Sequence, residues 1–160
     1  MKTIRRFSPG DETELSVIIQ RCFMELNIKD YSLDGLKYWS SLYTPEHVRE
    51  ISGRGHMYVM EENGKLLGTC SIVKKDSGKT YIEALYVTPD RPGEGIAKAL
   101  LKACEADRDY ADPAKTDRLW VDSSITARTF YEYMGYLHET GEPVCIENDH
   151  YIMNKPLKSN

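Results

Sequence analysis

Apolar residues in the first third of the chain recur at the three- and four-residue spacing of amphipathic helices. One stripe consists of Leu15, Ile18, Ile19, Cys22, Phe23 and Leu26. A second stripe consists of Leu33, Leu36, Trp39, Leu42 and Tyr43. Two capping segments precede the stripes. In Ser8-Pro9-Gly10-Asp11, Ser8 is the expected N-cap and Pro9 the first helical residue, and Asp30-Tyr31-Ser32 precedes the second stripe. Thr44-Pro45 then restarts a helix that Gly53 is expected to end.

Beyond Gly53 the pattern changes to that of strands. Residues 57–60, 66–73 and 81–87 are strand-like, and hairpin signals at Asn63-Gly64 and Asp76-Ser77-Gly78 separate them. Farther on, helical patterns at 96–104 and 126–134 alternate with strand patterns at 119–121, 144–146 and 150–153. With a short strand at 4–7, the order is β-α-α-β-β-β-α-β-α-β-β. This order predicts a single α/β (α+β) domain over residues 1–160, with a mixed, mostly antiparallel sheet flanked by helices.

Composition narrows the class of protein. A chain of 160 residues suits one domain, and 41% hydrophobic with 29% charged residues is typical of a folded globular protein. The 21 basic and 25 acidic residues give a net charge of −4 with no basic block, which argues against nucleic-acid binding. No apolar run approaches the ~20 residues of a membrane-spanning helix, and the first residues do not resemble a secretory signal. The four cysteines lie far apart, so we expect reduced thiols in a soluble cytoplasmic protein without a metal or a membrane partner.

A glycine loop joins the strand that ends at Val87 to the helix that starts near Ile96. Its residues, Pro92-Gly93-Glu94-Gly95, allow backbone N–H groups and the helix N-terminus to face an anion such as a phosphate. A tight turn without a ligand would use the same glycines. Two nucleotide-binding motifs do not match. A Walker A loop requires Gly-Lys-Ser/Thr where Gly95-Ile96-Ala97 stands, and a dinucleotide fingerprint requires a third glycine at Lys98.

Two segments resemble the GNAT superfamily of N-acetyltransferases. The first family motif is Gln/Arg-x-x-Gly-x-Gly/Ala after a strand ending in Val-x-Pro, and it is similar to residues 87–97. The second is Asn-x-x-Ala-x-x-Phe-Tyr-Glu-x-x-Gly-Phe, and it is similar to residues 124–136, which include Phe130-Tyr131-Glu132. The sequence of the second segment is also similar to that of a group of small bacterial proteins identified as acetyltransferases. The resemblance implies the GNAT fold, with acetyl-CoA as the acetyl donor.

The resemblance further implies that acetyl-CoA lies where the strand ending at Val87 separates from the strand at 119–121. The residues expected to bind it are Leu85, Tyr86, Val87, Arg91, Gly93, Glu94, Gly95, Ile96, Ala97, Lys98 and Ser124. Backbone groups of 85–87 would pair with the pantetheine arm, and the loop amides would hold the pyrophosphate. Pro92 replaces the Gln/Arg of the motif and Glu94 adds negative charge, so we expect a weaker anion site, to which Arg91 and Lys98 could return positive charge.

Catalytic roles also follow from the resemblance. Tyr131 stands where the family has its general acid, and a phenol with a pKa of ~10 can protonate a thiolate whose acid has a pKa of ~8.5. Glu83 is the candidate base, acting directly or through water, although a solvent-facing strand glutamate fits that position equally well. His56, His138 and His150 are weaker alternatives. The expected reaction is acetyl transfer to a primary amine by direct attack in a ternary complex.

Aromatic residues gather in the N-terminal helices, on the side where the family binds its acceptor. Tyr31, Trp39 and Tyr43 are the candidate acceptor pocket, since aromatic faces bind amines by cation–π contact and flat groups by stacking. Helix packing explains Trp39 equally well. The acceptor would be an amine on a small molecule or a peptide, and the protein a monomer or homodimer. The alternatives are a non-catalytic acyl-CoA-binding or regulatory module and a nucleotide-dependent enzyme.

Overall fold

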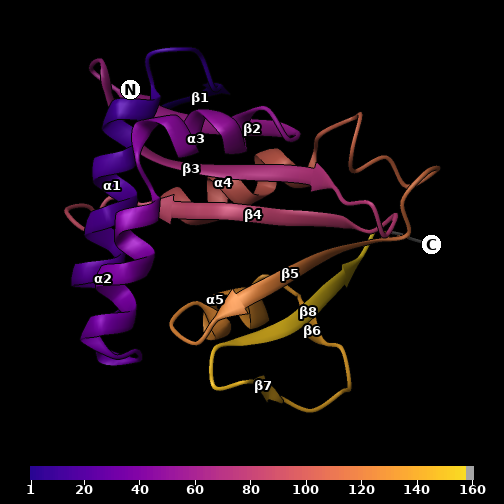
Figure 1. The fold of residues 1–160 in the computed structure, drawn as a ribbon. Coiled ribbons are helices and arrows are strands. Elements are labelled where there is room, and N and C mark those ends of the chain that lie inside the picture. Colours follow the sequence, from indigo (N-terminus) through magenta and orange to yellow (C-terminus); the bar gives the residue numbers. More distant parts are fainter. Residues whose placement is uncertain (158–160) are drawn as a thin grey trace.

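The computed structural model describes residues 1–157, in which one mixed sheet carries helices on both faces (Figure 1). The strands are β1 (Thr3–Arg6), β2 (His56–Glu62), β3 (Lys65–Lys74), β4 (Thr80–Val87), β5 (Arg118–Ser124), β6 (Leu137–His138), β7 (Cys145–Ile146) and β8 (His150–Pro156). They lie in the order β1-β2-β3-β4-β5-β8-β6, with β7 also paired to β8. Only β4 and β5 pair in parallel within this described part, so the predicted mixed, mostly antiparallel sheet is confirmed.

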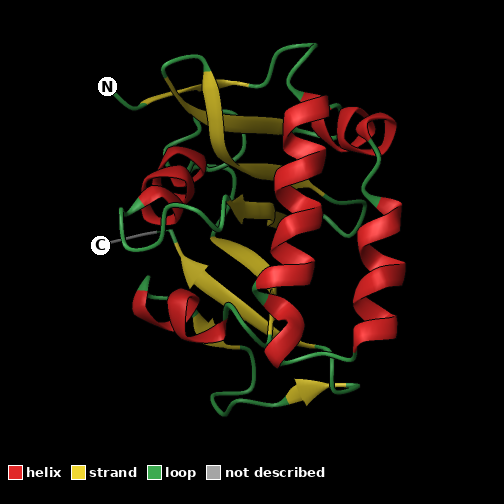
Figure 2. Ribbon diagram, turned by 90° about the vertical axis from the view of Figure 1, so that its left-hand side faces the viewer, coloured by secondary structure: helices red, strands yellow, loops and turns green. Residues whose placement is uncertain are grey.

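The helices form two layers around the sheet. They are α1 (Glu12–Glu25), a 3₁₀ turn η1 (Asn27–Lys29), α2 (Leu33–Leu42), α3 (Pro45–Ser52), α4 (Ile96–Glu105) and α5 (Arg128–Tyr133). Figure 2 shows α1, α2 and α3 on one face of the sheet and α4 and α5 on the other. Each layer has its own core. Leu100 of α4 and Leu119 of β5 are fully buried in one core. Leu15 of α1 and Val48 of α3 are fully buried in the other.

Two of the predicted helix caps are confirmed. The Ser32 hydroxyl accepts a hydrogen bond from the Gly35 N–H at 3.2 Å and starts α2. The Thr44 hydroxyl accepts from the His47 N–H at 3.3 Å and starts α3. These caps need only residues three positions apart, which is why the local sequence predicts them.

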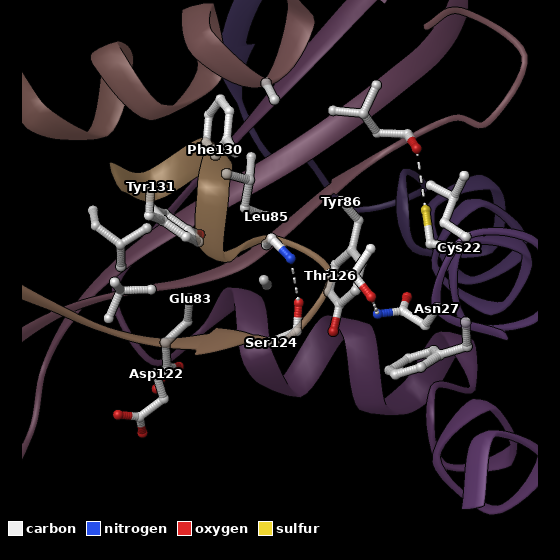
Figure 3. A pocket seen from close by; sticks show the side chains of 18 residues that line it. Cys22, Asn27, Glu83, Leu85, Tyr86, Asp122, Ser124, Thr126, Phe130 and Tyr131 are labelled. Atoms are coloured by element: carbon white, nitrogen blue, oxygen red, sulfur yellow. Dashed lines mark hydrogen bonds between the residues drawn. The ribbon is translucent and has the colours of Figure 1, made fainter. Parts of the chain in front are cut away.

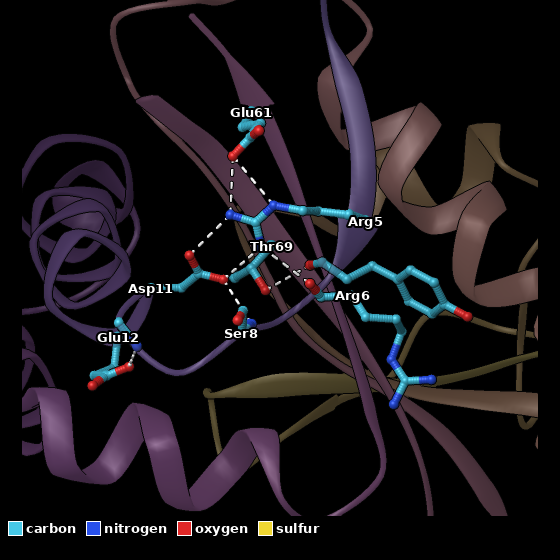
Figure 4. Close-up of polar contacts among 9 residues, drawn as sticks. Arg5, Arg6, Ser8, Asp11, Glu12, Glu61 and Thr69 are labelled. Atoms are coloured by element: carbon cyan, nitrogen blue, oxygen red, sulfur yellow. Dashed lines mark hydrogen bonds and ion pairs between the residues drawn. The ribbon is translucent and has the colours of Figure 1, made fainter. Parts of the chain in front are cut away.

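The predicted start of α1 is wrong, because the helix begins at Glu12 and Asp11 takes the position before it. An ion-pair cluster holds Asp11 there, in which the Arg5 guanidinium donates to Asp11 at 2.8 Å and to Glu61 at 2.9 Å (Figure 4). Asp11 also accepts from the Ser8 N–H at 2.8 Å. Since β1 and β2 bring Arg5 and Glu61 together, the helix start depends on residues distant in sequence.

Some elements go beyond the sequence prediction. The two-residue strand β6 and the turn η1 were not expected, because such short segments carry no periodic signal. The four cysteines are free thiols, as predicted, and three of them are buried. Among residues 1–157, no helix combines the length and apolar character that spanning a bilayer requires.

The sheet opens between β4 and β5. These strands pair only at Thr80–Leu119 and Tyr81–Trp120 and then diverge, as Figure 1 shows. Strand β4 also bulges at Ala84, which has a φ of +51°, and the register with β3 shifts there. From residue 82 onward, the edge of β4 that faces β5 is therefore left without a strand partner.

Candidate active site

A cavity of about 290 Å³ fills the opening between β4 and β5 (Figure 3). We call it the central cavity. Strand β4 supplies residues 82–87 to its wall, β5 supplies Val121, Asp122 and Ser124, α1 supplies Cys22 and Phe23, and α5 supplies Phe130 and Tyr131. The cavity therefore gives access to the unpaired edge of β4, whose backbone groups are available to an extended ligand.

The glycine loop leads from the end of β4 into α4 and leaves its amides free. Gly93 and Gly95 both have a φ near +74°, a conformation that favours glycine, and Gly95 precedes the first helical residue. The first N–H in this stretch with a partner is that of Ala99, which donates to the Gly95 carbonyl at 3.0 Å. Among residues 1–157, nothing accepts from the N–H groups of 93–98, so these amides are free donors at a helix N-terminus.

The side chains around this loop are already ion-paired. Glu94 accepts from Arg91 and lies 2.9 Å from Lys2, and these contacts lower the pKa of its carboxyl to about 2. Arg91 also donates to Glu62 at 2.8 Å. Direct contact between Arg91 and a phosphate would therefore compete with two carboxylates. Lys98 has no carboxylate partner among the described residues, and its ammonium lies over the Tyr133 ring, 5.6 Å from the ring centre. It is therefore a cation beside the amides that no described acidic side chain neutralises.

Tyr131 places a phenol at the central cavity. The residue is only 5% exposed and packs edge-on against Phe130 and Tyr136. Its hydroxyl has no hydrogen-bond partner in residues 1–157, yet the only completely enclosed, unbonded side-chain atom there is the Ser71 hydroxyl. The Tyr131 hydroxyl therefore opens onto the cavity, and Figure 3 shows it beside Leu85. Burial, with a smaller effect from Cys70 and Cys104, raises its pKa well above the ordinary value, so it stays protonated.

Glu83 lies on β4 in the wall of the central cavity. Its carboxylate is 2.9 Å from the Lys75 ammonium, which also lies over the Tyr81 ring at 3.9 Å. Glu83 thus lines the central cavity as a carboxylate that is already paired with a cation.

The three histidines have different surroundings. His56 is 2.7 Å from Asp107, which also accepts from Tyr58 at 2.7 Å, and this group lies outside the cavity. His138 is 2.8 Å from Glu132. Of these three candidates, only His150 lines a hollow next to the central cavity.

Two further hollows adjoin the central cavity on the side of the N-terminal helices. The helix-side hollow has a volume of about 340 Å³ and includes the predicted acceptor residues Tyr31 and Trp39. The α3 hollow has a volume of about 280 Å³ and includes Tyr43 and Glu83. The structure therefore divides the predicted acceptor residues between two neighbouring hollows.

The predicted acceptor residues also differ in their contacts. The Tyr31 hydroxyl accepts from the Ile125 N–H at 2.8 Å and donates to the Asp149 carbonyl at 2.5 Å, which closes the hollow around it. Tyr43 packs against Phe23 and Tyr86. Trp39 is 48% exposed, so helix packing alone does not account for it.

Ser124 helps to shape the end of β5. Its hydroxyl accepts from the Ala127 N–H at 3.1 Å and starts the turn into α5. Close by, the Asn27 side-chain amide donates to the Thr126 hydroxyl at 3.1 Å and ties η1 to this turn (Figure 3). These contacts hold the far wall of the cavity against the N-terminal helices.

Sequence reasoning missed Asp122, which lines the central cavity and both hollows. It is an exposed carboxylate in the middle of β5, on the same face as Ser124. Among residues 1–157 it has no ion-pair or hydrogen-bond partner. A charged residue inside a strand of the sheet can indicate a functional site, but only once the neighbouring strand is known to be absent at that position.

A family model described as an acetyltransferase (GNAT) domain matches residues 27–152 of the chain. The chain belongs to the GNAT acetyltransferase family. The match spans both the glycine loop and Tyr131. The expected family and fold are therefore confirmed.

Individual relatives agree with this GNAT assignment. The chain is 28% identical over 133 residues to the N-acetyltransferase YafP of Escherichia coli, itself uncharacterised, covering 83% of this chain and 79% of YafP. The fold is that of the GCN5-related N-acetyltransferase of Rhodopseudomonas palustris, with a TM-score of 0.80 at 23% identity over 98% of this chain and 96% of the other. It is also that of the paiA N-acetyltransferase of Thermoplasma acidophilum, solved with coenzyme A, with a TM-score of 0.77 at 18% identity over 98% and 99% of the two chains.

Proposed function

We propose that this GNAT protein transfers an acetyl group from acetyl-CoA to a primary amine by direct attack within a ternary complex. The observation that carries the proposal is the opening between β4 and β5, which joins free loop amides at one end to an unbonded phenol in its wall. A solved relative of the same fold that contains coenzyme A supports the same donor here.

The donor would be held mainly by backbone groups. The free N–H groups of 93–98 suit the pyrophosphate, and the unpaired edge of β4 at residues 85–87 suits an extended amide chain. The Cys22 thiol donates to the Val87 carbonyl at 3.1 Å, so this carbonyl is already partly satisfied. Lys98 would add positive charge, and Ser124 lies at the opposite wall.

Acetyl-CoA supplies an activated thioester, and the protein must manage two protons. Tyr131 is suited to be the general acid, because its phenol is protonated, unbonded and open to the cavity. Glu83, through water, would take the proton that the amine loses, where the α3 hollow adjoins the central cavity. Both residues line the central cavity, so acid and base would share one site with the reacting carbonyl.

Replacing the proposed acid tests this function. We expect Tyr131→Phe to lower kcat about 100-fold for any accepted amine, since positioned proton transfer contributes ~10²–10⁴-fold, while the Kd for acetyl-CoA stays within about twofold. Tyr133→Phe is the matched control, because Tyr133 is 74% exposed and we expect no change. Equal turnover in Tyr131→Phe and the unmodified protein would remove Tyr131 from the mechanism.

A non-catalytic acyl-CoA-binding module is the second candidate, favoured by Pro92 and the acidic Glu94 in the loop. Measuring the Kd for acetyl-CoA together with acetyl transfer separates the two candidates. Tight binding of acetyl-CoA with no acetyl transfer across a broad panel of amines supports the module. No binding of acetyl-CoA overturns both.

A further inference from the structure

The helix-side hollow has a definite chemical character. Its wall combines the aromatic side chains of Phe23, Tyr31 and Trp39 with the carboxylates of Asp122 and Asp149. A volume of about 340 Å³ lies in the range of small-molecule sites. It shares Phe23, Asp122 and other residues with the central cavity, so a ligand in the hollow would have its end next to the proposed reaction site.

Asp122 is the group that links this hollow to the proposed chemistry. It is the one residue among those described that lines the central cavity, the helix-side hollow and the α3 hollow together. Figure 3 shows it at the same end of the cavity as Glu83. Glu83 has Lys75 as a partner at 2.9 Å, whereas Asp122 has no partner within the described residues. Asp122 is thus the free anion of the pair.

The charges around Asp122 leave an anionic ligand without a partner in this hollow. The only other titratable side chains of the helix-side hollow are Tyr31, Asp149 and His150, and His150 is 3.1 Å from the Asp149 carboxylate. The nearby cations line the α3 hollow, where Lys75 pairs with Glu83 and Arg54 donates to Glu50 at 3.4 Å. A cation is therefore favoured in the helix-side hollow and an anion is disfavoured.

The apolar part of the wall points to the rest of the ligand. Trp39 is half-exposed although its ring is large. The Tyr38 ring packs edge-to-face with it, with ring centres 5.5 Å apart, and supports it from one side. An aromatic face of this kind binds flat apolar groups and cations alike. The Tyr31 hydroxyl is fixed by two hydrogen bonds, which keeps its ring in the wall.

We propose that the acceptor is a small cationic amine with a flat apolar body, in which Asp122 binds the ammonium and the aromatic wall around Trp39 binds the body. The inference rests on the proposed function, because it assigns the acceptor class of that site. Asp122 acts here as a specificity-determining residue. It would hold the amine at the mouth of the central cavity until the amine loses its proton.

Binding of three probes that share a phenylethyl group tests this proposal without requiring turnover. The probes are 2-phenylethylamine, the neutral 2-phenylethanol and the anionic 3-phenylpropanoate, each titrated calorimetrically into the protein with and without saturating CoA. We expect the amine to bind at least tenfold more tightly than the alcohol, and the acid to bind most weakly, because a charge-assisted contact to Asp122 is available only to the amine.

Variants then assign the preference to residues. Asp122→Asn should weaken the amine about tenfold and leave the alcohol unchanged, and Asp122→Glu should recover most of the loss. Trp39→Ala should weaken amine and alcohol alike, about threefold, because it removes the shared apolar contact. Asp117→Asn is the control, since that side chain is 89% exposed and lines none of the three cavities, and we expect no change.

The outcomes separate the two levels of the proposal. Equal binding of amine and alcohol, preference for the acid, or an Asp122→Asn variant that still binds the amine normally would overturn the acceptor class. The affinity for acetyl-CoA is measured on the same proteins and should not change in Asp122→Asn. Absence of acetyl-CoA binding in the unmodified protein would overturn the proposed function, whatever the amine probes show.

Discussion

Gly68 supports the proposed donor site from the far side of β4. It lies on β3 opposite Val87. A Cβ atom at this position would lie 2.5 Å from the Tyr86 carbonyl oxygen, 3.1 Å from the Val87 Cα and 3.2 Å from a methyl group of Leu100. Two of these atoms belong to the backbone, so Gly68→Ala forces β4 itself to move.

The expected size of the effect follows from these distances. To turn a 2.5 Å approach into an ordinary contact of 3.4 Å, β4 must retreat by about 0.9 Å. Inserting an atom into a packed region costs ~1–3 kcal/mol, so we expect the free energy of unfolding to fall by about 2 kcal/mol. For a chain of this length that is a decrease of about 4–8 °C in Tm. The displaced segment is the proposed pantetheine-binding edge, and a shift of ~1 Å there can lower kcat by as much as ~100-fold.

Urea unfolding measures the loss of stability of Gly68→Ala, an acetyl-transfer assay measures the loss of kcat, and calorimetry measures its affinity for acetyl-CoA. Gly53→Ala is the control, because a Cβ there meets only an ordinary contact of 3.5 Å and Gly53 has helical dihedral angles. We expect Gly53→Ala to keep or raise the stability by up to ~1 kcal/mol and to bind acetyl-CoA normally. If Gly68→Ala unfolds and binds like the unmodified protein, then β3 does not position the edge of β4 and the reasoning is refuted.

Two other predictions concern charge. Lys98→Glu should weaken acetyl-CoA about tenfold at low salt and less at high salt, whereas Lys102→Glu, one turn farther along α4, should stay within about twofold; equal effects would contradict a local phosphate contact. At Asp11, burial alone would raise the pKa, but hydrogen bonds from Arg5 and Ser8 outweigh it and lower the pKa. A carboxyl whose pKa is lowered in the folded state stabilises the protein above about pH 4. This stabilisation is lost as the pH falls below that value. Urea unfolding should thus show Asp11→Asn about 1 kcal/mol less stable at pH 6, with a gap that narrows toward pH 3; a pH-independent gap would contradict the pairing with Arg5.

Local signals explain why much of the fold could be predicted from the sequence. The caps at Ser32 and Thr44 and the hairpin at Asn63-Gly64 depend on neighbouring residues, and the structure has all three. The start of α1 could not be predicted in the same way, because Arg5 and Glu61 fix Asp11 from two strands distant in sequence. Periodicity is a local property and contains no information about such partners.

The candidate site divides along the same line. Tyr131 and the glycine loop were found from motif resemblance, and the structure brings both to one cavity or its approach. Asp122 was not found, because its exposure depends on β4 leaving β5 after Tyr81. In a sheet that stayed closed, the same aspartate would lie beside a neighbouring strand, so its role is set by strand divergence rather than by its own sequence context.

The carboxylates near the two ends of the cavity differ in whether they are paired. At the loop, Glu94 and Glu62 are balanced by Arg91 and Lys2, so this cluster carries no net charge toward a phosphate despite its acidic members. The expectation that Glu94 weakens the anion site is thereby reduced, since a paired carboxylate repels an anion at a distance far less than a free one. At the other end no cation among the described residues neutralises the Asp122 carboxylate, so it can attract a cationic ligand. Anion binding by backbone amides and cation binding by a free carboxylate can therefore occur in one continuous cavity of a chain whose net charge is −4.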